Sequence, residues 1–142
     1  MTAYREVCAY SAIRVRSIEA SDIDHFQPKS LHPKLAYEWS NFRFARKRTN
    51  SKKGVKTILD PFHIEPDWFV LDFTTFMVYP NQNLPDDLKQ QIQETIGNLG
   101  LNERDYVDVR EEIFNDFSGN PVRLQKESPF IAYEMVRQGL SN

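Results

Sequence analysis

The spacing of apolar residues in the second half of the chain restricts its fold more than any other feature. Leucine and isoleucine recur at about one helical turn across 84–99, with Pro85 near the start and Gly100 after the end. A second apolar stripe covers 106–117, and a third helix is expected to begin at Ser128-Pro129 and to run through about residue 137. Such stripes belong to helices that bury one face, so this half predicts helices packed on a shared core.

The first half has shorter apolar runs. Residues 13–16 alternate apolar and basic side chains, and 23–26 is a second short run, so we expect these two segments to pair as a small hairpin. Residues 39–46 are ambiguous in type, and we favour an extended segment leading into a turn. A short helix should then begin near Thr49 and end at Gly54.

Between these regions, two apolar runs at 68–73 and 76–79 flank Thr74-Thr75 and predict a β-hairpin. Residues 2–8 are expected to form either the end of a short helix or a lead-in, and 33–37 a single helical turn. The sequence therefore predicts the α+β class, with two short strands and a helix first, then a β-hairpin, then a C-terminal helical region.

Length and composition favour one domain spanning residues 1–142, with an N-terminal core over 8–58 and an extension over 59–142. No apolar run approaches the roughly 20 residues of a membrane span, and the first residues lack the apolar segment of a signal peptide. We therefore expect a cytoplasmic protein that does not enter a membrane. Cys8 is the single cysteine, which excludes an intrachain disulfide and a cysteine-rich zinc site.

The distribution of charge is more informative than the net charge of −2. The stretch from residue 39 to 59 contains no acidic residue. Its basic residues are Arg43, Arg46, Lys47, Arg48, Lys52, Lys53 and Lys56. A basic stretch on an otherwise acidic chain suits a polyanion that is met at one place, and we expect it to bind nucleic acid together with Lys29. The alternative is a solvated helix face.

The same region contains the residue types that hydrolysis of a phosphodiester requires. Such a reaction needs a base that titrates near neutral pH, and His25 has the right side chain. Asp24 and Asn50 can offer oxygen ligands to a divalent ion, and Asn41 can hold the histidine in place. Lys53, one helical turn after Asn50, can meet a phosphate. The alternatives are a core histidine, a turn asparagine, a helix-capping asparagine and a solvated lysine.

The pattern of these residues resembles a known family. Asp-His-Phe-x-Pro-Lys at 24–29, Trp-x-Asn at 39–41 and Asn-x-x-Lys-Gly at 50–54 resemble the HNH endonucleases, also called ββα-metal or His-Me finger nucleases. The resemblance covers about residues 8–54 and implies a ββα-metal core. The wider frame is similar to bacterial anti-phage defence HNH proteins of the Septu and retron type, which implies an ATPase or another defence-system subunit as partner.

The resemblance also implies a role for each matched position. Asp24 and Asn50 correspond to metal ligands, His25 to the general base and Asn41 to the residue that orients the base. Lys53 corresponds to the lysine that follows the last metal ligand.

The chain departs from the family where many members bind structural zinc with two Cys-x-x-Cys pairs. The matching positions here are Cys8 and Ser11, then Arg46 and Thr49, so three of the four ligands are missing. We therefore expect no structural zinc. The hard oxygen donors of Asp24 and Asn50 favour one Mg²⁺ or Mn²⁺ ion.

Together these features predict a metal-dependent endonuclease that hydrolyses DNA phosphodiester bonds, with DNA preferred over RNA, as an effector of prokaryotic anti-phage defence. Two alternatives stay open. One is a catalytically silent subunit that binds nucleic acid, and the other is an RNase toxin that uses the same site.

Overall fold

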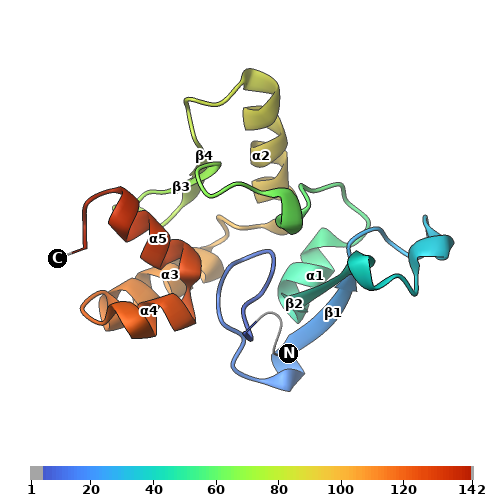
Figure 1. Ribbon diagram of the computed structural model, residues 1–142, viewed down its shortest axis with the longest axis horizontal. Coiled ribbons are helices and arrows are strands. Elements are labelled where there is room, and N and C mark those ends of the chain that lie inside the picture. The colour runs from blue at the N-terminus through green and yellow to red at the C-terminus, as the bar shows by residue number, and fades with distance from the viewer. Residues whose placement is uncertain (1–4, 142) are drawn as a thin grey trace.

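The computed structural model describes residues 5–141 and has the mixed α+β class that the sequence predicts (Figure 1). Within these residues there are two small antiparallel sheets, five α-helices and several short 3₁₀ turns. No helix in this range is both long and apolar enough to cross a membrane. In chain order the elements are β1 Ser21–His25, β2 Phe42–Arg46, α1 Lys47–Lys53, β3 Phe69–Leu71, β4 Val78–Pro80, α2 Asp86–Leu99, α3 Arg104–Phe117, α4 Pro121–Glu127 and α5 Pro129–Arg137.

The first sheet and the first helix form a continuous strand–strand–helix unit. Strands β1 and β2 pair antiparallel, with Asp24 opposite Arg43 and His25 opposite Phe42. Helix α1 follows β2 without a loop and packs on both strands. It ends at Gly54, whose φ of +50° is a conformation that side chains with a Cβ rarely adopt. The short helix ending at Gly54 is confirmed, although it begins two residues earlier than expected.

The expected pairing of 13–16 with 23–26 is wrong. Strand β1 pairs instead with β2, and residues 13–16 form only a bridge between Arg14 and Val7. Three consecutive residues of β2, 43–45, are buried, so this segment joins the core as the partner of β1. The lead-in expected over 2–8 falls partly outside the described residues, and 5–8 form a turn and this bridge.

The second half matches the helical periodicity, with one addition. Strands β3 and β4 form the expected hairpin, and α2, α3 and α5 occupy the three predicted helical segments. Helix α4 was not expected, because Asn120-Pro121 directly follows the second apolar stripe and is also a signal that ends a helix. The Asn120 side chain accepts a hydrogen bond from the Arg123 amide, and Pro121 occupies the first helical turn, so these residues also begin a helix.

The N-terminal segment joins the two halves of the molecule. Tyr10, Ile13 and Val15 belong to one buried apolar cluster that also contains Phe44 of β2 and residues of α2, α3, α4 and α5. Figure 1 shows this segment in blue, passing between the strand–strand–helix unit and the C-terminal helices.

Residues 26–41 form an arm between β1 and β2. The arm projects away from the rest of the molecule, in cyan in Figure 1. It contains two 3₁₀ turns, Pro33–Leu35 and Trp39–Asn41, and the first lies in the segment expected to form a helical turn.

Candidate functional site

Asp24 is a buried carboxylate at the end of β1. Its Oδ2 accepts a hydrogen bond from the Tyr10 hydroxyl and lies 3.1 Å from Nζ of Lys53. Burial and the hydrogen bond to Asp24 raise the pKa of Tyr10, so the phenol stays protonated and donates. Both contacts reach the same oxygen of Asp24.

His25 follows Asp24 and points to the other side of the strand, as alternation requires. Its Nε2 lies 3.0 Å from the backbone oxygen of Ala36, and its ring packs edge-on against Phe42 at 5.1 Å. A carbonyl oxygen only accepts hydrogen bonds, so Nε2 carries the proton. In the neutral ring, Nδ1 is then the basic nitrogen.

Asn41 acts on the arm and not on the imidazole. The side chain is buried, its Oδ1 accepts from the Gln27 amide at 2.7 Å, and its Nδ2 donates to the oxygens of Gln27 and Leu35 at 3.0 and 3.2 Å. Leu35 precedes Ala36, which binds His25. The expected link between Asn41 and the histidine is therefore indirect, through the backbone of the arm.

Two side-chain pairs connect β1 to α1. Asp22 and Asp24 lie on the same face of the strand, about 7 Å apart. Asn50 and Lys53 lie one turn apart on the helix. Nδ2 of Asn50 donates to Oδ2 of Asp22 at 2.7 Å, and Lys53 pairs with Asp24. The structure thus places Asn50 beside Asp22 and Lys53 beside Asp24.

These donors fit a hard divalent ion in type. The carboxylates of Asp22 and Asp24 and the amide oxygen of Asn50 are ligands that Mg²⁺ prefers. Among the described residues no three His, Cys, Asp or Glu side chains are grouped to hold an ion, so the fit depends on Asn50. The ammonium of Lys53 already neutralises Asp24, and an ion would share that carboxylate with it.

Two of the basic residues expected to contact phosphate are buried. Arg43 is 2% exposed, and its guanidinium makes a bidentate ion pair with Asp60, with N–O distances of 2.8 Å. Lys53 is 0% exposed, and its Nζ also donates to the backbone oxygen of His25 at 3.2 Å. Neither side chain reaches the surface in this structure, and each is held in an ion pair, Arg43 with Asp60 and Lys53 with Asp24.

Two acidic residues at the start of α3, its N-cap Glu103 and Asp105, bind two further cations of the basic stretch. Arg48 forms ion pairs with Glu103 and Asp105, and Lys52 pairs with Glu103 at 2.5 Å. These hydrogen bonds, that from Lys52 above all, lower the pKa of Glu103. The side chains stay exposed, but part of their charge is neutralised.

The other basic positions are more open. Arg46 is half-buried, with its guanidinium 5.7 Å from the ring centre of Tyr106. Lys29 on the arm, Lys47 at the start of α1 and Lys56 after it are all exposed. Lys56 donates to the backbone oxygen of Lys52 at 3.0 Å. These positions form the cationic surface that solvent reaches.

Several residues around the site were missed by sequence reasoning. Tyr10 and the Ala36 carbonyl hold Asp24 and His25, but no local spacing connects them to those residues. Asp22 had a usable signal, because it lies two residues before Asp24 and so shares its strand face. Glu103 is separated from the basic stretch by more than forty residues and carries no motif of its own.

Comparison with known protein-family models and with curated proteins finds no match to this chain.

Proposed function

We propose that this protein is a metal-dependent endonuclease that hydrolyses phosphodiester bonds of DNA. The observation that supports the proposal best is the meeting of β1 and α1, where Asp24 pairs with Lys53 and Asn50 with Asp22. The four residues come from segments more than twenty residues apart, and three of them, Asp24, Asn50 and Lys53, belong to the HNH-like motif. A bound divalent ion would stabilise the negative charge that develops on the phosphate and the leaving oxygen.

His25 is the proposed general base. The hydrogen bond from Nε2 to Ala36 fixes the ring orientation and the tautomer, which leaves Nδ1 to accept a proton from water. Asn41 is a positioning residue in this proposal, because it fixes the arm that carries the Ala36 carbonyl. Removing it should affect the alignment of the base without removing the base.

The proposed substrate surface consists of Lys29, Lys47 and Lys56, with Arg46, Arg48 and Lys52 at its border. Such cations contact phosphates and carry no base code, so cleavage is expected to show little sequence preference. Binding should weaken steeply with salt, because each neutralised phosphate releases counterions.

One observation favours a second candidate, a nucleic-acid-binding subunit without catalysis. Tyr10 and Lys53 already bind Asp24, and Asp22 already binds Asn50, so both carboxylates have partners without an ion. A protein of this kind would bind nucleic acid equally well in EDTA and would not cleave it in Mg²⁺ or Mn²⁺.

A plasmid-nicking assay with Mg²⁺, Mn²⁺ or EDTA separates the two candidates. We expect the wild type to nick in a divalent ion, and both His25→Ala and His25→Gln to lose at least a hundredfold in rate. The glutamine variant keeps a donor for Ala36 but has no basic nitrogen. His63→Ala, at an exposed histidine outside the cluster, is the matched control and should cleave normally.

Wild-type cleavage by His25→Gln would show that His25 is not the base. Cleavage of a single-stranded RNA with no cleavage of plasmid would move the proposal to an RNase. Circular dichroism and the thermal midpoint of each variant show whether a loss of activity comes from unfolding.

A further inference from the structure

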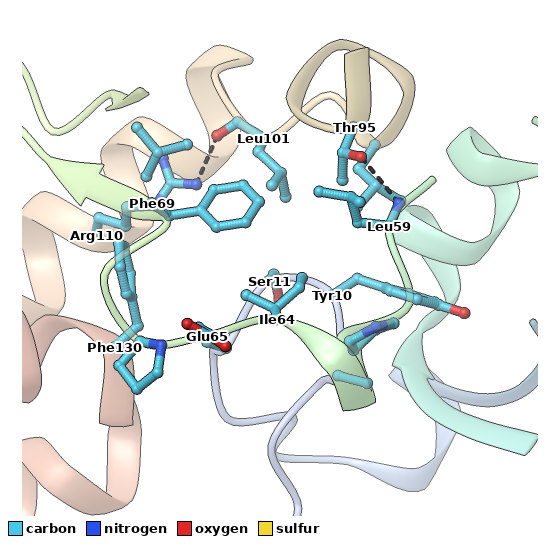
Figure 2. A pocket seen from close by; sticks show the side chains of 16 residues that line it. Tyr10, Ser11, Leu59, Ile64, Glu65, Phe69, Thr95, Leu101, Arg110 and Phe130 are labelled. Atoms are coloured by element: carbon cyan, nitrogen blue, oxygen red, sulfur yellow. Dashed lines mark hydrogen bonds between the residues drawn. The ribbon is translucent and has the colours of Figure 1, made fainter. Parts of the chain in front are cut away.

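A second concave site lies on the other side of Tyr10, between the N-terminal turn, the segment 59–69 and the helices. The cavity measures about 240 Å³ and its wall is mostly apolar. Figure 2 shows Leu101 and Thr95 on one side, with Ser11 and Ile64 facing them. The apolar wall comes chiefly from Leu59, Ile64, Phe69, Leu99, Leu101 and Phe130. A largely apolar hollow with few polar groups is the usual form of a small-molecule site.

Ser11 is the first polar group of this cavity. It is 6% exposed, and among the described residues its Oγ is the one buried side-chain nitrogen or oxygen that has no hydrogen-bond partner. The turn that carries it is held by backbone bonds from Cys8 to Ile13 at 3.0 Å and from Ala12 to Cys8 at 3.0 Å. A buried hydroxyl without a partner is unfavourable, and a ligand atom in the cavity would satisfy it.

Arg110 is the second polar group. It is buried, and its guanidinium donates to the backbone oxygens of Phe76 and Leu101, the second of which appears as a dashed line in Figure 2. Within residues 5–141 no carboxylate lies at ion-pair distance from it. Two neutral carbonyls do not cancel a buried positive charge, which favours an anion nearby. Burial lowers the pKa of Arg110 to about 10, so it remains charged at neutral pH.

We propose that this cavity binds a small aromatic carboxylate, with its ring against the apolar wall and its carboxylate toward Ser11 and Arg110. Glu65 also lines the cavity and is exposed. Its negative charge disfavours an anion beside it, so the ligand carboxylate is expected to point away from Glu65 and toward Ser11 and Arg110.

The cavity and the candidate nuclease site share Tyr10. The tyrosine lines the cavity while its hydroxyl donates to Asp24, so a ligand packed against the ring would bias the position of that carboxylate. A ligand effect on cleavage rests on the proposed function. Binding to the cavity does not, and it is measured separately.

The test is an NMR and calorimetric titration of the full chain with four probes: phenylacetate, indole-3-acetate and their neutral amides. We expect saturable shifts at the amides of Ser11, Thr95 and Leu101, with each acid binding at least about tenfold tighter than its amide. Ser11→Ala should weaken the acids about tenfold and leave the thermal midpoint unchanged or higher. Ser30→Ala, on the exposed arm, is the control.

The proposal fails if neither acid gives a saturable shift at millimolar concentration. It also fails if the amides bind as tightly as the acids, or if Ser11→Ala binds like the wild type. A positive titration with no nicking activity would retain the cavity site while rejecting the nuclease.

Discussion

At the scale of single residues, the contact between Tyr10 and Asp24 is the one on which the candidate site depends most. The hydroxyl is buried and donates to a buried carboxylate, a type of hydrogen bond that is stronger than one between neutral groups. Tyr10→Phe removes only this hydroxyl. We expect the variant to lose about 1–3 kcal/mol of unfolding free energy in urea denaturation at pH 7. A loss near zero would show that Lys53 alone is enough to hold Asp24.

The same residue gives a pH prediction. Burial raises the pKa of Tyr10, and of Tyr106 as well, above the ordinary value of 10.0. Their contribution to stability is complete below pH 10 and is lost as the pH rises further, because the unfolded chain releases these protons first. The lowered pKa of Arg110 makes its own contribution to stability rise with pH, and this contribution is the same in the wild type and in Tyr10→Phe. Tyr10→Phe should therefore lose less stability than the wild type between pH 9 and 11, and parallel curves would contradict this.

The sequence proposed candidate residues for the site but not their contacts. Asp24, His25, Asn50 and Lys53 were chosen by residue type and by the motif they resemble, and helical spacing placed Asn50 and Lys53 on one face. The contacts of Arg43 were not predicted. It lies in a basic run, but its position in β2 faces the interior, where Asp60 binds it. Partners so distant in sequence are fixed by the tertiary fold.

At the scale of elements, acidic residues at the start of α3 form ion pairs with basic residues of α1. Glu103 binds both Arg48 and Lys52, so Glu103→Gln should free Lys52 for a nucleic acid and leave Arg48 paired with Asp105 alone. We expect tighter binding to DNA and a steeper slope of log K against log salt, measured by fluorescence anisotropy. Glu111→Gln, also on α3 and exposed, is the matched control. Equal affinities for the two variants would place the nucleic acid elsewhere.

The arm between β1 and β2 carries two unusually exposed aromatic residues. Tyr37 is 95% and Trp39 83% exposed, and the Trp39 ring packs edge-on against Phe42, which in turn contacts His25. Exposed rings beside lysines are suited to stacking with unpaired bases. Trp39→Ala should weaken binding to single-stranded DNA by about 5- to 100-fold and affect duplex DNA much less. Equal losses on both would argue against stacking.

The elements themselves were predictable to different degrees. The stripes of α2, α3 and α5 are long enough for their period to be read, and each helix was confirmed. Helix α4 has only seven residues, and its start signal at Asn120-Pro121 is also a stop signal. The sequence does not show which segment pairs with β1, because both 13–16 and 42–46 have apolar patterns typical of a strand. The pairing depends on how the arm and α1 pack in the folded protein.

At the scale of the whole molecule, a buried carboxylate connects the N-terminal segment to the C-terminal helices. Glu127 of α4 is almost fully buried and forms ion pairs with Arg14, Arg16 and Arg123 at 3.4, 3.1 and 2.9 Å. The Arg14 amide also donates to the Glu127 backbone oxygen at 2.8 Å. This cluster fixes the N-terminal segment against the C-terminal helices, and the N-terminal segment carries Tyr10 to Asp24.

Glu127→Gln therefore tests whether the chain is one cooperative domain. The change leaves Arg16 and Arg123 without a carboxylate partner and Arg14 with Glu6 alone. It should cost about 2–4 kcal/mol, a little less than a fully buried pair because the arginines partly reach solvent. Hydrogen exchange under increasing urea should show residues 42–53 and 121–137 losing protection together, at a lower midpoint than in the wild type. Glu94→Gln, on the exposed face of α2, should leave the midpoint unchanged. If only 121–137 shifted, the strand–strand–helix unit would be stable by itself, and Tyr10 would not transmit changes from the helices to Asp24.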